Sequence, residues 1–133
     1  MIALLAAAIL LRPPDPSIAP TAATVARNLD LTSFPNSTGP RRKAGARTPA
    51  DYGFTVVDAD GSLAVLSEKD RSWEISVTLI SQDHGDAIVC FGDDARNGGA
   101  YHAQAPLTLR HGEDGLYRPL PERPQIPTCP AKP

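Results

Sequence analysis

The stretch Trp73-Glu74-Ile75-Ser76-Val77-Thr78-Leu79-Ile80 decides the fold of this chain. Its apolar residues alternate with Glu, Ser and Thr along most of its length. Successive side chains of an extended strand point to opposite faces, so this alternation gives one apolar and one polar face. A helix would instead scatter the same apolar groups around its circumference. The stretch therefore predicts a β-strand with one buried face and one face toward water.

The sequence on both sides of this stretch has the same character. Residues 54–57 and 63–66 are apolar runs that flank Asp58-Ala59-Asp60-Gly61, and the Asp-Gly pair suits the tight turn of a hairpin. Residues 87–91 are apolar on both faces, which is typical of a central strand, and residues 107–110 and 115–118 suggest a second hairpin. We predict a mainly β fold, a small antiparallel meander that forms a sandwich or an open barrel.

Proline placement sets the expected domain boundaries. Of the 14 prolines, seven precede residue 50, six lie at or after residue 119, and only Pro106 lies between. Proline lacks a backbone donor, so regular structure is expected where it is absent. We expect a short helical turn within Thr24–Leu31, and irregular proline-rich N- and C-terminal segments. The expected units are a signal peptide (1–23), an irregular N-terminal segment with a basic loop (24–50), a β domain core (51–118) and a tail (119–133).

The N-terminal residues have most features of an export signal. Residues 2–11 are an unbroken apolar run, and a helix of about 15 Å covers only half of a bilayer's hydrocarbon core. Prolines then end the run, and small residues at Ala19 and Ala23 suit a signal peptidase. We expect cleavage after Ala23, because Pro20 disfavours a cut after Ala19. No basic residue precedes the run, and a buried helix of the domain is the alternative interpretation. The prediction is a periplasmic or secreted protein without stable membrane insertion after cleavage.

The two cysteines agree with this location. Cys90 and Cys129 belong to no Cys-x-x-Cys redox or zinc pattern. An even count in an exported chain predicts one disulfide, which would tie the proline-rich tail to the β domain. Two unrelated thiols are the alternative.

Two groups of residues are candidates for binding. The first is the loop from Phe34 to Arg47, in which Phe34 could anchor the loop on the core and the arginines could bind phosphate or carboxylate. A solvated loop is the simpler interpretation, and the Asn-Ser-Thr sequon at Asn36 matters only in a eukaryote. The second is the mouth of the predicted barrel, which Tyr52, Tyr101 and His102 would line. The candidate binding residues are Phe34, Asn36, Arg41, Arg42, Tyr101 and His102.

Motifs for metal binding and catalysis are missing from the sequence. The histidines His84, His102 and His111 lack ligand spacing, so no metal site is predicted. Aligning Asp58-Ala59-Asp60-Gly61 with a calcium loop puts Ser67 where a bidentate Glu is required. There is no Gly-x-Ser-x-Gly elbow and no phosphate-binding glycine loop. We therefore predict a protein that is not an enzyme and uses no cofactor.

Charge and composition indicate which kinds of binding partner to expect. The formal net charge is −2, so no general attraction to nucleic acid is expected. The Arg-, Ala- and Pro-rich composition suggests a bacterial source. Our main hypothesis is a non-catalytic exported domain that contacts a protein or envelope component through a strand edge or the Phe34–Arg47 loop. A small-ligand or anion binder is the alternative, and a hydrolase built on His84, His102 and nearby Asp residues is the least favoured.

Overall fold

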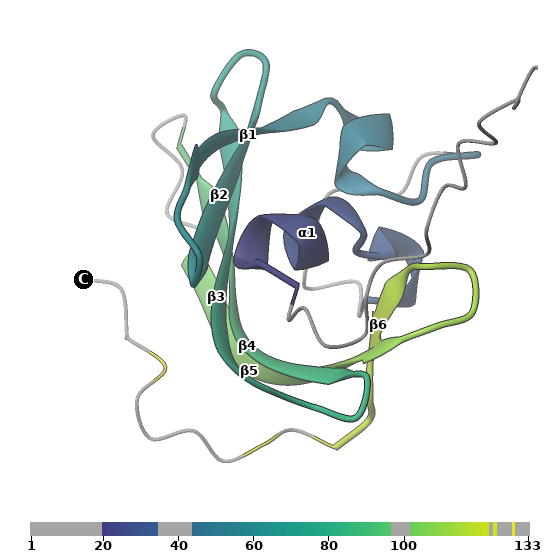
Figure 1. Ribbon diagram of the computed structural model, residues 1–133. Coiled ribbons are helices and arrows are strands. Elements are labelled where there is room, and N and C mark those ends of the chain that lie inside the picture. Colours follow the sequence, from purple (N-terminus) through teal and green to yellow (C-terminus); the bar gives the residue numbers. More distant parts are fainter. Residues whose placement is uncertain (1–19, 35–43, 97–101, 123, 125–128, 130–133) are drawn as a thin grey trace, which may run out of the picture.

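Six antiparallel strands form one open sheet in the order β1-β2-β3-β4-β5-β6 (Figure 1). The computed structural model describes residues 20–34, 44–96, 102–122, 124 and 129. The predicted mainly β meander is confirmed, and the sheet is a single curved layer. The strands are β1 (Phe54–Ala59), β2 (Leu63–Glu68), β3 (Trp73–Asp83), β4 (Asp86–Ala95), β5 (His102–His111) and β6 (Tyr117–Pro119).

The alternation in β3 works as the sequence predicts. Ile75 and Val77 are buried, and Trp73 and Leu79 pack against the same core. The strand is longer than predicted and continues to Asp83, so its connection to β4 is only His84-Gly85. Both turn residues have positive φ, 46° and 84°. This is the backbone of a two-residue hairpin turn, and its twist matches that of the strands.

Three short helices lie on the concave side of the sheet: α1 (Ala22–Arg27), η1 (Leu31–Ser33) and η2 (Pro49–Tyr52). The expected helical turn within Thr24–Leu31 is therefore present but begins two residues earlier. Thr21 caps α1, because its side-chain oxygen accepts a hydrogen bond from the Thr24 N–H. The described parts of segment 24–50 are more regular than the sequence predicts, because they also include η1 and the start of η2.

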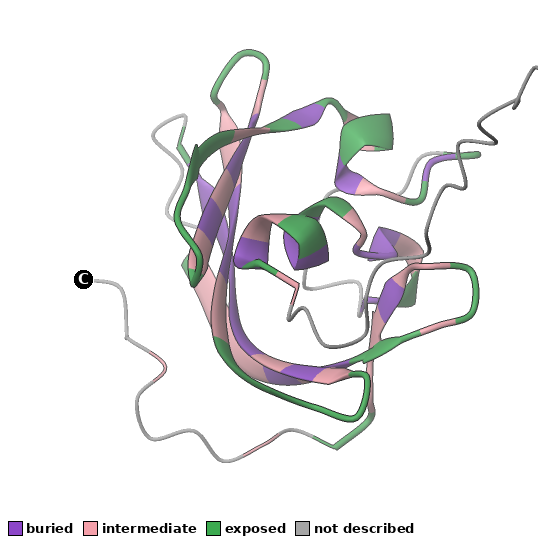
Figure 2. Ribbon diagram, viewed as in Figure 1, coloured by how far each residue is buried: buried purple, intermediate pink, exposed green. Residues whose placement is uncertain are grey.

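The core lies between these helices and the concave face. Figure 2 shows the buried residues of α1 facing those of the strands, with exposed residues at the hairpin turns. Burying both apolar surfaces against each other removes them from water, which is the main favourable term in folding. The largest fully buried apolar side chains are Phe34, Phe54, Phe91, Leu29, Leu66, Ile75, Leu109, Val25, Val77 and Val89.

The convex face is less exposed than the sequence predicts. Ser76, expected to face water, is buried at 6% exposure. Cys90 projects from this face, because its neighbours Val89 and Phe91 point into the core. The predicted Cys90–Cys129 disulfide is present and brings Cys129 onto the convex face. The strand pattern alone does not predict the burial of Ser76.

Candidate functional site

The structure places two of the six candidate binding residues. Phe34 is 1% exposed, and its ring lies 4.9 Å from the ring of Phe91, so it anchors the N-terminal segment in the core. His102 begins β5 and is half exposed. Asn36, Arg41, Arg42 and Tyr101 lie outside the described residues.

His102 forms the most chemically distinct pair in the described chain. Its Nδ1 lies 3.1 Å from Oδ1 of Asp94, whose side chain is 1% exposed. The two residues are cross-strand partners in β4 and β5, so register brings them together. The carboxylate beside Nδ1 orients the imidazole ring. Within the described residues no hydrogen bond joins Nε2 to a hydroxyl nucleophile.

Beside this pair, buried Gly92 lies on the convex face between two polar residues. Register places Ser76 on one side of Gly92 and Gln104 on the other. Oε1 of Gln104 is the one buried side-chain oxygen or nitrogen without a hydrogen-bond partner in the part of the chain described. Buried acceptors are normally paired, because an unpaired one loses its hydrogen bond to water. The same burial keeps Oε1 out of reach of a bound molecule.

We expect Gly92→Ala to destabilise the protein by about 1–2 kcal/mol, because added side-chain volume in a packed site forces its neighbours to move. A Cβ at position 92 would overlap Oγ of Ser76, whereas Cβ of Ser76 would be at 3.6 Å, an ordinary contact. Urea denaturation measures the change. The double variant Ser76→Ala/Gly92→Ala should recover most of the loss relative to Ser76→Ala. No recovery would mean that the hydroxyl is not the obstacle.

A second buried carboxylate lies on the opposite face of the same strand. Asp93 points to the concave side, is fully buried, and accepts a hydrogen bond from the indole N–H of Trp73. Its strand neighbour Phe91 contacts Phe34. Two adjacent acids in a sequence suggest a solvated turn. Here Asp93 and Asp94 lie instead in β4, which continues to Ala95, and each carboxylate is buried beside a polar partner on its own face of the sheet.

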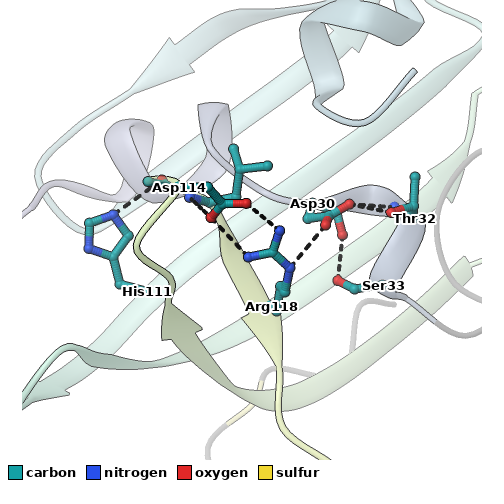
Figure 3. Close-up of polar contacts among 8 residues, drawn as sticks. Asp30, Thr32, Ser33, His111, Asp114 and Arg118 are labelled. Atoms are coloured by element: carbon teal, nitrogen blue, oxygen red, sulfur yellow. Dashed lines mark hydrogen bonds and ion pairs between the residues drawn. The ribbon is translucent and has the colours of Figure 1, made fainter. Parts of the chain in front are cut away.

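Arg118 joins the N-terminal segment to the last hairpin, as Figure 3 shows. Its Nε lies 3.0 Å from Asp30 Oδ2, and its two terminal nitrogens contact the Asp114 carboxylate at 2.9 and 2.5 Å. Asp30 is almost fully buried and also accepts hydrogen bonds from the backbone and hydroxyl of Thr32. The planar guanidinium suits this two-sided arrangement. We call this group, Asp30, Thr32, Asp114 and Arg118, the Arg118 clasp.

We expect the Arg118 clasp to make stability depend on pH. Hydrogen bonds from the Arg118 guanidinium, and then from the Leu116 N–H, hold the pKa of Asp114 well below its usual value of 3.8. A carboxyl with a lowered pKa in the folded state stabilises the fold above its unfolded pKa, and this stabilisation is lost as pH falls. We expect the urea midpoint to fall below about pH 4. The urea midpoint of the Asp114→Asn variant should fall less steeply with pH. The midpoint of Glu113→Gln, which changes the adjacent acid, should follow that of the wild type. Parallel curves for all three proteins would contradict the prediction.

The remaining predicted candidates do not converge. Tyr52 packs against the core, whereas His102 lies on the convex face, so they do not share a barrel mouth. His102 and His111 occupy opposite ends of β5, and His84 is in the exposed β3–β4 turn. Among the described residues, no group of three or more His, Cys, Asp or Glu side chains could hold a metal ion.

One edge of the sheet is open to solvent. β1 is the terminal strand on one side, and most of it is exposed (Figure 2). Val57 sits at a bulge between Val56 and Asp58 and is 52% exposed. At the other edge, β6 has only three residues, and Leu29 bridges to Tyr117 beside it. No interstrand pairing lies beyond β1 within the ranges that the structure describes.

No protein-family model, curated protein or solved structure matches this chain. The candidate sites therefore rest on geometry alone. Two of them are structural in their contacts: the Arg118 clasp holds the N-terminal segment, and Asp93 orients Trp73 within the core. The Asp94–His102 pair and the β1 edge are the two remaining features, and both reach the surface.

Proposed function

We propose that this chain is an exported, non-catalytic β domain that binds a protein partner by pairing an extended segment of that partner with the edge of β1. The observation that supports this most is the open edge itself, a six-residue strand in which Val57 is half exposed. Unpaired backbone groups at a sheet edge provide hydrogen bonds to an added strand, and neighbouring side chains provide selectivity.

The filled concave side favours this proposal over a small-ligand barrel. Val25, Ala26 and Leu29 on the N-terminal segment and Phe34 after η1 occupy the space that a ligand would need, and each is fully or almost fully buried. A ligand pocket is usually a preformed concave space with a few polar groups. The side chains that enter the concave side here are instead packed against one another.

The proposed location outside the cytoplasm is supported by the disulfide, because such bonds persist in oxidising compartments. None of the helices in the described ranges is long and apolar enough to cross a membrane. A periplasmic or secreted location remains our proposal.

If the leader is cleaved, we expect the cut before Ala19 rather than after Ala23, because Pro20 disfavours a cut directly after Ala19. Ala22 is buried, its N–H donates to the Gly61 carbonyl at 3.2 Å, and Thr21 caps α1. A cut after Ala23 would remove both residues and the first turn of the helix. The intact mass of the exported chain should include Pro20. A mature chain that begins at Thr24 would contradict this expectation.

The binding proposal can be tested without knowing the natural partner. A displayed library of short random peptides is selected against the disulfide-bonded protein, and hydrogen exchange then locates each selected peptide. We expect new protection of backbone amides within residues 54–59. Val57→Ser should weaken binding about fivefold through lost apolar contact, whereas Ile80→Ser, at a similarly exposed apolar residue on β3, should not. Selected peptides that protect other segments, or the absence of any selected peptide, would rule out the proposal.

A further inference from the structure

The hairpin that carries the open edge contains acidic residues but no basic ones. Residues 48–68 contain four acidic residues and no Lys or Arg, although the whole chain has a net charge of only −2. The rest of the chain therefore carries a net positive charge of two. Asp51 lies in η2, and Lys69 and Arg71 follow Glu68 in the β2–β3 turn. The negative charge at the edge is therefore concentrated at the end of β1 that carries Asp58 and Asp60.

The acidic groups nearest the open edge face water. Asp58 lies in β1 directly after the bulge, and Asp60 lies in the turn that follows; both are exposed. Hydrogen bonds from the Ser62 and Leu63 N–H groups lower the pKa of Asp60, which further favours its ionised form. No ion pair with a basic side chain involves either carboxylate within the described ranges.

We propose that the occupant of the β1 edge is an extended segment with Lys or Arg beside β-branched or apolar residues. This inference rests on the proposed function and specifies its partner. The carboxylates supply charge complementarity at one end of the edge, and Val57 supplies an apolar contact. Complementary charge of this kind raises the association rate and excludes partners of like charge.

A second copy of this chain is a poor occupant of the same edge. An antiparallel pair of β1 strands centred on Asp58 would place the exposed Asp58 side chains of the two copies directly opposite each other. Like charges directly opposite each other destabilise paired strands. The same charges thus discourage self-association and favour a basic strand.

Three fluorescent peptides provide the test. They share an alternating Thr-Val centre and differ only in flanks of Lys, Gln or Glu, and fluorescence anisotropy measures their Kd for the disulfide-bonded protein. We expect the Lys peptide to bind about fivefold more tightly than the Gln peptide at low salt, since one exposed ion pair gives up to about that factor. The Glu peptide should bind most weakly, and the differences should shrink above about 0.15 M salt.

Two charge variants show whether β1 is responsible. Asp58→Lys should reverse the order of the Lys and Glu peptides, whereas Glu113→Gln, which neutralises an exposed acid in the β5–β6 turn, should leave it unchanged. Equal affinity for all three peptides, with β1 protected from hydrogen exchange, would overturn the charge inference and leave the proposed function standing. If no peptide protects β1, both are overturned.

Discussion

Reduction of the Cys90–Cys129 bridge should lower the free energy of unfolding by about 4 kcal/mol. The bridge joins residues separated by 39 positions, and closing a loop of that length removes about this much chain entropy from the unfolded state. Domains of this size have total stabilities of about 5–15 kcal/mol, so the loss is a large fraction of the whole. The expected magnitude follows from the length of the loop alone.

Urea denaturation with and without reductant measures this effect. The double variant Cys90→Ala/Cys129→Ala should match the reduced wild type and should not respond to reductant, which separates the bridge from other effects of the reagent. Alanine is the better replacement at position 90, because this site is almost fully buried and a serine hydroxyl there would need a partner. A loss below about 1 kcal/mol would mean that the unfolded chain is already restricted near these residues.

The strand pattern could be predicted because it is local. Period-two alternation identifies β3, and the Asp-Gly pair identifies the first hairpin, since both signals lie within a few residues. The start of β5 is less readily predicted, because Pro106 argues against a strand there. In the structure, β6 pairs only with residues 109–111 of β5. At Pro106, β5 is therefore an edge strand, and the missing N–H of proline breaks no hydrogen bond to β6.

The candidate sites were much less predictable, because each depends on contacts between distant segments. Asp94 and His102 meet only because the β4–β5 register places them opposite each other. The Arg118 clasp joins Asp30 to the last strand, and no local motif marks that contact. Even the adjacent acids Asp93 and Asp94 look like a turn until the strand sends one to each face. The residue type made His102 a candidate, but the sequence alone could not show that Asp94 lies beside it.

Phe34→Ala should destabilise the protein by about 3–5 kcal/mol, the usual cost of removing a buried aromatic ring and leaving a cavity. The ring is 1% exposed and packs on Phe91, which lies on the concave face of the central strand β4. It therefore holds the end of the N-terminal segment against the sheet. Val57→Ala, at a half-exposed site, is the control and should change stability by less than about 0.5 kcal/mol.

The two variants also separate an anchoring role from a binding role. If Phe34 is an anchor, its replacement lowers the urea midpoint, and peptide affinity for β1 is unchanged under conditions where the variant is still folded. Phe34→Leu should retain most of the stability, because Leu fills much of the same space. A stable Phe34→Ala protein that no longer binds peptides would instead assign the ring to the binding surface. The burial of the ring and its contact with Phe91 lead us to expect the first result.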